Sequence, residues 1–254
     1  MTFDYLLAVL PVLALTYIAS GIVKGVTGFG MPFIAVPGAA LALGIPITQA
    51  MAWVMISAFT TNSVQLIQNV RYWRIIREIW PLLLTMAAFM MASVQLLSVL
   101  RSEWLSIFLG VVIVVTISAQ MLKKWDVQSD QRRRAYILSG AISGFSGGLT
   151  SFYGFPALQV MLASGMKKEE FIFSAGLLLF MGTTILTLGL STQGLMTKQD
   201  GVMSLLLLFP AIIGLLIGQR VRRVLSPAGF SRVVMGVLLA TGLSMFMRGV
   251  WGLL

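Results

Sequence analysis

The sequence contains no cysteine and no histidine among its 254 residues. Without cysteine, the chain cannot form a disulfide, a thiolate nucleophile or a cysteine metal site. Without histidine, it lacks the commonest metal ligand and the usual proton carrier near neutral pH. These absences leave few ways to build a metal centre or a catalytic pair, so we expect no metal, no cofactor and no enzymatic activity.

Charged residues are also scarce, at 10% of the chain, whereas 58% of the residues are hydrophobic. A soluble domain of this length needs about a quarter of its residues charged to cover its surface. Most of this surface must therefore face lipid, and the composition predicts an integral membrane protein.

Six apolar segments are close to the ~20 residues that a helix needs to cross a hydrocarbon core of ~30 Å. They are residues 48–67, 80–100, 104–122, 171–190, 201–218 and 233–251. Two further apolar regions, 6–43 and 135–165, are too long for one crossing and are broken in the middle. No Asp or Glu falls within any predicted span, so the sequence offers no membrane carboxylate to carry a proton.

Fourteen of the eighteen basic residues fall in four loops that single crossings place on one side of the membrane. Because positive loops resist translocation, we expect this side to be cytoplasmic and both termini to be periplasmic. Topology then accounts for the net charge of +10, and no nucleic-acid partner is expected. The loops contain Arg71, Arg74 and Arg77; Lys123, Lys124, Arg132, Arg133 and Arg134; Lys167 and Lys168; and Arg220, Arg222, Arg223 and Arg232.

This topology makes the two broken regions hairpins of opposite orientation, each followed by three spanning helices. The chain then divides into a first repeat (1–122), a basic cytoplasmic linker (123–134) and a second repeat (135–254). Matched positions lie 123 to 126 residues apart, as in Gly30-Met31-Pro32 and Gly154-Phe155-Pro156. The expected fold is an all-α polytopic membrane protein with two inverted-topology repeats, each a broken or re-entrant helical hairpin followed by three transmembrane helices.

The two breaks are the candidate site. In GIVKGVTGFGMP, residues 21–32, glycine lets the backbone leave one helix and Pro32 suits the first turn of the next. Unpaired N–H groups at new helix starts attract anions, and Lys24 adds a full positive charge at a depth where charge is costly. We therefore expect both breaks to contribute to one pocket for a small oxyanion. The candidate substrate-binding residues are Lys24, Gly25, Thr27, Gly28, Phe29, Gly30, Thr150, Ser151, Tyr153 and Gly154.

Other interpretations of these residues stay open. The pairs Gly21-x-x-x-Gly25 and Gly144-x-x-x-Gly148 also fit close helix packing, and Lys24 could extend to the outer surface instead. A further polar set either lines the pathway or hydrogen-bonds between helices. It comprises Thr60, Thr61, Asn62, Gln65, Thr183 and Thr184.

Two stretches of the sequence resemble a known family. GIVKGVTGFGMPFIAVP resembles the glycine-rich signature of the TauE/SafE sulfite exporters, also called the TSUP (4-toluene sulfonate uptake permease) family. GAISGFSGGLTSFYGFPALQVML resembles the family's second copy, although it has Ser151-Phe152-Tyr153 where small residues are usual. The resemblance implies movement of sulfite or of small organosulfur and carboxylate anions across the bacterial inner membrane.

The function expected from these arguments is transport of a small anion, with sulfite or an organosulfonate as the implied substrate. Export by alternating access follows from the resemblance, whereas the residues themselves do not define a direction. A passive small-anion channel and an uptake permease for a small carboxylate or sulfonate share the same features. The expected partners are the anion and the lipid bilayer, and the sequence leaves open a homo-oligomer.

Overall fold

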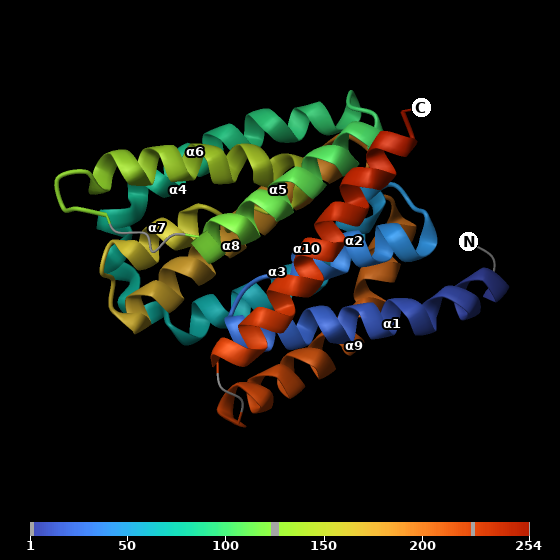
Figure 1. Ribbon diagram of the computed structural model, residues 1–254, viewed down its shortest axis with the longest axis horizontal. Helices are drawn as coiled ribbons and strands as arrows, with labels where there is room; N and C mark the ends of the chain where they lie inside the picture. Colours follow the sequence, from blue (N-terminus) through green and yellow to red (C-terminus); the bar gives the residue numbers. More distant parts are fainter. Residues whose placement is uncertain (1–2, 123–126, 225–226, 254) are drawn as a thin grey trace. The chain divides into compact units, whose positions relative to one another are not determined.

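The computed structural model describes residues 3–122, 127–224 and 227–253, with side chains for 9–120, 127–222 and 235–253. Within these ranges every regular element is a helix, which confirms the all-α prediction (Figure 1). The side chains of Asp4, Lys123, Lys124, Arg223 and Arg232, and residue Leu254, lie outside them. The helices are α1 (Phe3–Thr27), α2 (Met31–Leu43), α3 (Ile47–Gln68), η1 (Val70–Ile75), α4 (Ile76–Val94), η2 (Gln95–Ser98), α5 (Ser102–Leu122), α6 (Arg132–Thr150), α7 (Ala157–Ala163), α8 (Lys168–Thr192), α9 (Lys198–Val224) and α10 (Pro227–Trp251).

Six helical stretches are long and apolar enough to cross a membrane. Five of them contain α3, α4, α5, α8 and α9, and match the predicted spans to within a few residues except at the start of α4. The sixth, Val9–Thr27, belongs to the first broken region, whereas the described apolar part of α10, Met235–Trp251, is shorter. The chain is therefore a multi-pass membrane protein.

Each broken region consists of a long helix, a break and a short helix. At about 1.5 Å per residue, α1 is ~37 Å long and α2 ~20 Å, whereas α6 is ~28 Å and α7 ~10 Å. Only the first helix of each region can cross most of a ~30 Å core. The re-entrant course of these regions stays a prediction.

The helices gather into two compact units, and each unit contains elements from both halves of the chain. The first comprises Met1–Ser57, Ser102–Val114 and Met196–Leu254, and the second comprises Ala58–Arg101 and Val115–Leu195. The first unit thus contains α1, α2, α9 and α10, and the second contains α4, α6, α7 and α8.

In the first unit, glycines bring α1 against α9 (Figure 1). A Cβ at Gly21 would overlap the carbonyl oxygen of Ala211, and a Cβ at Gly214 would overlap that of Ile18. The hydrophobic effect does not hold helices together in lipid, so van der Waals contact at such close approaches stabilises the helix pair instead. The guanidinium of Arg248 on α10 completes the unit, because it donates to the Ala40 carbonyl near the end of α2.

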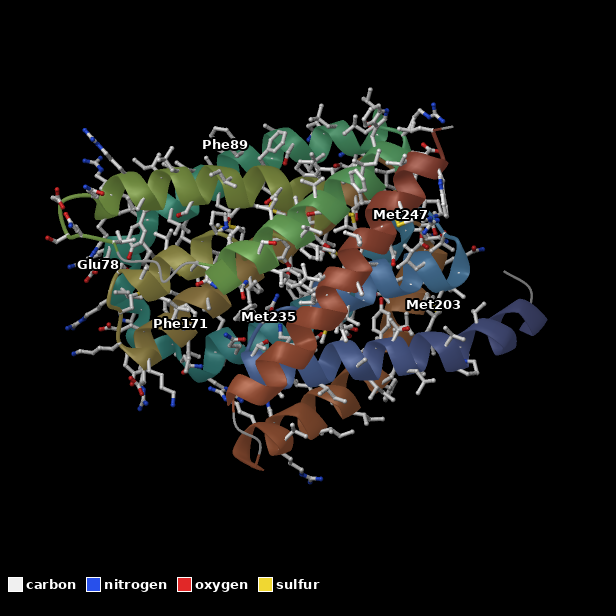
Figure 2. All side chains as sticks on the ribbon, viewed as in Figure 1. Glu78, Phe89, Phe171, Met203, Met235 and Met247 are labelled. Atoms are coloured by element: carbon white, nitrogen blue, oxygen red, sulfur yellow. The ribbon has the colours of Figure 1, made fainter. Side chains whose placement is uncertain are left out.

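In the second unit, glycines likewise allow α6 to pack closely against α4 (Figure 1). A Cβ at Gly140 would overlap the carbonyl oxygen of Leu82, and a Cβ at Gly144 would overlap that of Met86. Apolar side chains on α4 that do not face this contact project outward, as Phe89 does at 48% exposed (Figure 2). The packing interpretation of the Gly144 motif is therefore correct.

Candidate functional site

The first break begins where α1 ends at Thr27. The N–H of Gly28 donates to the Lys24 carbonyl at 2.7 Å, and Gly28 then takes a left-handed conformation with φ +84°. The Thr27 hydroxyl lies 2.8 Å from the Val23 carbonyl oxygen and 2.6 Å from that of Phe29. It also accepts the Phe29 N–H at 3.3 Å, so one side chain holds the chain on both sides of the turn.

Lys24 lies in the last turn of α1 and is 4% exposed. Its side chain is therefore enclosed by protein and does not extend to the outer surface. Gly30, at φ +90°, then precedes α2, whose second residue is Pro32. The positive φ explains the glycine, because other residues adopt this conformation only with strain.

The second break repeats this hydrogen-bond pattern 123 residues later. The N–H of Ser151 donates to the Gly147 carbonyl at 2.8 Å, and Ser151 is left-handed with φ 64°. The Thr150 hydroxyl donates to the Ser146 carbonyl at 2.6 Å and accepts the Phe152 N–H at 3.2 Å. Thr-x-Phe therefore makes the same turn at the end of α1 and at the end of α6.

The two breaks differ after the phenylalanine. Tyr153 is an additional residue in the second break, which is why the offset rises from 123 to 124 at Gly154. Gly154 does not have a positive φ, and a Cβ there would lie 3.1 Å from Leu158 Cδ1. The Ala157 N–H at the start of α7 is capped by the Ser143 hydroxyl at 2.9 Å.

The hydroxyl groups of the predicted site all have protein partners. Beyond the two threonines, the Ser151 hydroxyl donates to the Thr150 carbonyl at 2.5 Å, and the Tyr153 hydroxyl lies 2.6 Å from Thr183 Oγ1. These groups therefore stabilise the breaks, and their contact with a substrate stays a prediction.

Backbone N–H groups are the donors that remain. In the described part of the chain, the N–H groups of Gly30 and Met31 have no hydrogen-bond partner, and neither do those of Tyr153 and Gly154. Each break thus presents two adjacent N–H groups, an arrangement that suits an oxyanion.

The other predicted residues have clear positions. A Cβ at Gly25 would overlap the Leu215 carbonyl on α9, so the structure favours a packing role for this glycine. No atom lies within 4 Å of a Cβ built at Gly28, and Phe29 is half-buried.

Three of the predicted residues meet inside the second unit. Asn62 Nδ2 donates to Thr183 Oγ1 at 2.9 Å and to the Leu179 carbonyl at 3.2 Å. Thr183 Oγ1 donates to the same carbonyl at 2.8 Å. The Tyr153 hydroxyl, from the second break, hydrogen-bonds to Thr183 Oγ1. The sequence left open whether Asn62 and Thr183 line a pathway or hydrogen-bond between helices, and it predicted Tyr153 in the pocket; in the structure the three side chains form one hydrogen-bonded cluster between helices.

The remaining polar residues of this set bond to helix backbone. Gln65 Nε2 donates to the Ile172 carbonyl at 3.2 Å, and Thr184 donates within its own helix at 2.9 Å. Thr61 donates to the Ala58 carbonyl at 3.2 Å. Thr60 is half-buried.

Sequence reasoning missed one buried carboxylate. The predicted span 201–218 leaves Asp200 just outside, but this residue lies in the first turn of α9 and is 7% exposed. The stretch Lys198–Arg222 is apolar enough to span a membrane, so this carboxylate lies within a candidate span. Thr197, three residues earlier, was the available signal, because Thr-x-x-Asp is a helix N-cap pattern.

Comparison with known proteins decides the class of this molecule. The sulfite exporter TauE/SafE family matches residues 13–245, which is most of the chain. The chain belongs to the TauE/SafE family. A curated relative, the probable sulfite/organosulfonate exporter TauE of Cupriavidus necator, is 25% identical over 228 residues, or 89% of each chain. No solved structure matches.

Family membership confirms the resemblance seen in the two glycine-rich stretches. TauE/SafE proteins are transporters and not enzymes, so this chain is a membrane transporter of a small anion.

Proposed function

We propose that this TauE/SafE protein exports sulfite or an organosulfonate across the inner membrane of a bacterium. The relative from Cupriavidus necator has this substrate class and direction in its name. The observation that carries the proposal is the pair of breaks, each with two adjacent backbone N–H groups that have no partner in the described structure. The buried Lys24 lies in the last turn of the helix that ends at the first break.

An oxyanion suits these donors better than a halide does. Sulfite and sulfonate groups each present three oxygens, which can accept N–H groups arriving from several directions, and Lys24 supplies attraction at longer range. The sequence predicts that both breaks contribute to one pocket, and alternating access would expose that pocket to each side in turn.

Two observations support the proposed duplication of the chain at the linker 123–134. The Thr-x-Phe turn recurs at an offset of 123 with the same hydrogen bonds. The helix before the first break, α1, is packed against α9, and the helix before the second, α6, is packed against α4. Under the predicted duplication α9 and α4 are themselves equivalent, so these contacts agree with a repeat of hairpin and three helices.

Contacts within the second unit support the proposed topology for three of the four basic loops. Arg132 at the start of α6 is 3.6 Å from Glu78 at the start of α4, and it donates to the Ser164 carbonyl before Lys167. Three of the predicted cytoplasmic loops therefore lie at one end of this unit.

Reconstituted vesicles test the substrate. Liposomes that contain the purified protein and are loaded with sulfite should release sulfite faster than protein-free liposomes with the same load. The rate should saturate as the internal sulfite concentration rises. Taurine and acetate efflux measured in parallel separates sulfonate from carboxylate specificity. A rate that rises linearly without saturation would identify a channel, and no sulfite or sulfonate flux would contradict the proposal.

Cysteine labelling tests the topology, and the absence of native cysteine makes every introduced cysteine unique. Cysteines placed at Asp4 and next to Leu254 should react with an impermeant maleimide in intact cells. Cysteines at Arg71 and Arg220 should react only after the membrane is opened. The reverse pattern would place the termini inside.

A further inference from the structure

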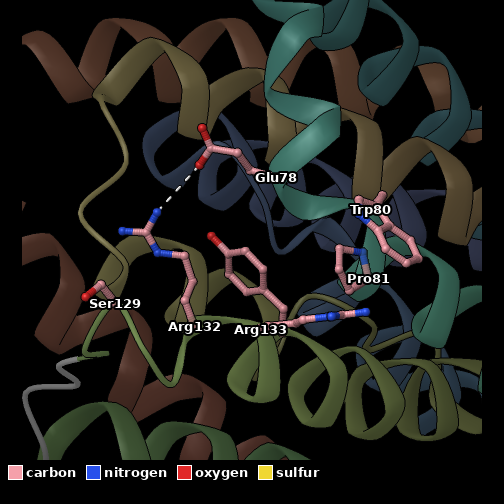
Figure 3. Close-up of a pocket in the computed structure, with 7 residues that line it drawn as sticks. Glu78, Trp80, Pro81, Ser129, Arg132 and Arg133 are labelled. Atoms are coloured by element: carbon pink, nitrogen blue, oxygen red, sulfur yellow. Dashed lines mark ion pairs between the residues drawn. The ribbon is translucent and has the colours of Figure 1, made fainter.

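A pocket of about 530 Å³ lies in the second unit, at the opposite end of α6 from the second break. It is formed where the first turns of α4 and α6 approach one another, at the end of the unit predicted to face the cytoplasm. From the sequence alone, its arginines indicate only the topology. The lining residues are Glu78, Trp80, Pro81, Ser129, Arg132, Arg133 and Tyr136 (Figure 3).

The two arginines have different surroundings. Arg132 points across the pocket to Glu78, at 3.6 Å, and donates to the Ser164 carbonyl at 3.0 Å (Figure 3). Arg133 has its guanidinium carbon 6.0 Å from the centre of the Trp80 ring. Arg132 is therefore held by protein, whereas Arg133 lies on an aromatic face with its donors available.

The pocket retains donors for an anion. Arg132 Nε is buried and has no partner among the described residues, and Gln131, the N-cap of α6, makes no side-chain capping bond. The first turn of α6 therefore adds unpaired N–H groups and the positive end of a helix dipole. With one glutamate against two arginines, the pocket has a net positive charge.

Exposed apolar surface begins directly beside this charge. On α4, Trp80 and Leu84 are 47% and 61% exposed, and on α6, Ile137 is 38% exposed. Leu84 follows Trp80 by four residues, and Ile137 follows Arg133 by four, so each continues one helix face away from the pocket. Exposed tryptophan at the edge of an apolar band is typical of the membrane interface.

We infer that this pocket binds the phosphodiester headgroup of an anionic glycerophospholipid, with its acyl chains along the exposed faces of α4 and α6. Arg133 and the first turn of α6 contact the phosphate, and Trp80 marks the level of the glycerol. Glu78 holds Arg132 in place and can accept a hydrogen bond from a headgroup hydroxyl, which favours phosphatidylglycerol. Basic pockets between membrane helices on the cytoplasmic side recognise anionic headgroups by this chemistry.

A lipid titration of the purified full-length transporter tests the inference. Dioctanoyl-phosphatidylglycerol should raise the melting temperature in detergent, with a saturable dependence, whereas dioctanoyl-phosphatidylcholine should not. Arg133→Gln should weaken the apparent affinity at least fivefold, and Arg133→Lys should retain most of it. Arg134→Gln is the matched control, since Arg134 is exposed on the same turn but does not line the pocket.

Further measurements distinguish a lipid headgroup from free phosphate as the ligand. Inorganic phosphate that stabilises the protein as well as the lipid does would overturn the lipid assignment. Equal effects of Arg133→Gln and Arg134→Gln, or equal binding of both lipids, would overturn the pocket. If Arg133→Gln does not fold, Trp80→Leu provides the second test, and lipid affinity unchanged in that variant would also contradict the inference.

Discussion

The indole Nε1–H of Trp53 donates a hydrogen bond of 2.8 Å to Asp200 Oδ1, although 147 residues separate them. The other carboxylate oxygen accepts the Thr197 N–H at 2.9 Å and the Thr197 hydroxyl at 2.6 Å. The Asp200 N–H in turn donates to Thr197 Oγ1 at 3.2 Å. The first turn of α9 is thus capped and tied to α3 by a single carboxylate.

Asp200→Ala should destabilise the protein by about 2–4 kcal/mol, because it removes a helix cap and leaves a buried indole N–H unpaired. The melting temperature in detergent measures this loss. The double variant Trp53→Phe/Asp200→Ala should lose less stability than the sum of the losses in the two single variants, since both changes remove the same hydrogen bond. Lys198→Ala, an exposed change in the same turn, should cost less than about 0.5 kcal/mol.

Transport by Asp200→Asn distinguishes a structural carboxylate from a coupling one. Trp53 and Thr197 already donate to this carboxylate, so its role in the structure is to anchor a helix. We expect sulfite flux per folded protein to stay within about twofold of the unchanged protein, roughly 0.4 kcal/mol. A folded variant without flux would instead assign Asp200 to ion coupling.

Lys24→Met should leave a folded transporter that binds sulfite at least tenfold more weakly, a loss of about 1.4 kcal/mol. Methionine fills a similar buried volume without the charge, so packing around α1 changes little. Isothermal calorimetry with sulfite provides the measurement, and Lys24→Arg should bind more tightly than Lys24→Met because it retains the charge. Equal sulfite affinity in Lys24→Met and the unchanged protein would remove Lys24 from the site.

Gly28→Ala should cost about 1–2 kcal/mol, because φ +84° is strained for a residue with a Cβ even though open space surrounds it. Gly28→Asn should cost less, since asparagine tolerates the left-handed conformation. At the equivalent position, Ser151→Gly should change stability by less than Gly28→Ala does, because relief of strain offsets added chain entropy. Thermal unfolding of the three variants checks this order, which a purely steric role for Gly28 would not produce.

Gly144→Ala should cost about 1–3 kcal/mol, because its new methyl group would overlap the Met86 carbonyl and force α6 away from α4. Gly201→Ala is the matched control, since no atom lies within 4 Å of a Cβ built there. That change should be neutral or slightly stabilising. Comparable stability changes in the two variants would contradict the overlap with the Met86 carbonyl as the cause of the loss.

Much of this molecule follows from local sequence. Apolar length predicts the spanning helices to within a few residues, and Gly28 and Pro32 predict where α1 ends and α2 begins. Both signals depend on a few neighbouring residues, so they can be interpreted without partners. Thr27-Gly28-Phe29 and Thr150-Ser151-Phe152 also make their turns with bonds that reach only four residues along the chain.

The start of α4 shows where local interpretation is insufficient. The predicted span begins at residue 80, but the helix begins at Ile76 after the 3₁₀ turn η1. Polar and charged residues in this first turn place it outside an apolar window. The first turn of a helix carries no hydropathy signal when it lies at the membrane surface.

Only the tertiary structure decided the roles of the polar side chains. A serine or threonine in a membrane helix looks the same in sequence whether it faces a substrate, a neighbouring helix or its own backbone. Tyr153, Asn62 and Thr183 form one cluster because three distant segments pack together, and Asp200 is buried because Trp53 reaches it. The sequence by itself determined the family, the spans and the two breaks, since hydropathy and backbone freedom are local properties. The partners of Tyr153, Asn62 and Asp200 depended on contacts across the fold, because a buried polar group must be satisfied by whichever segment packing brings beside it.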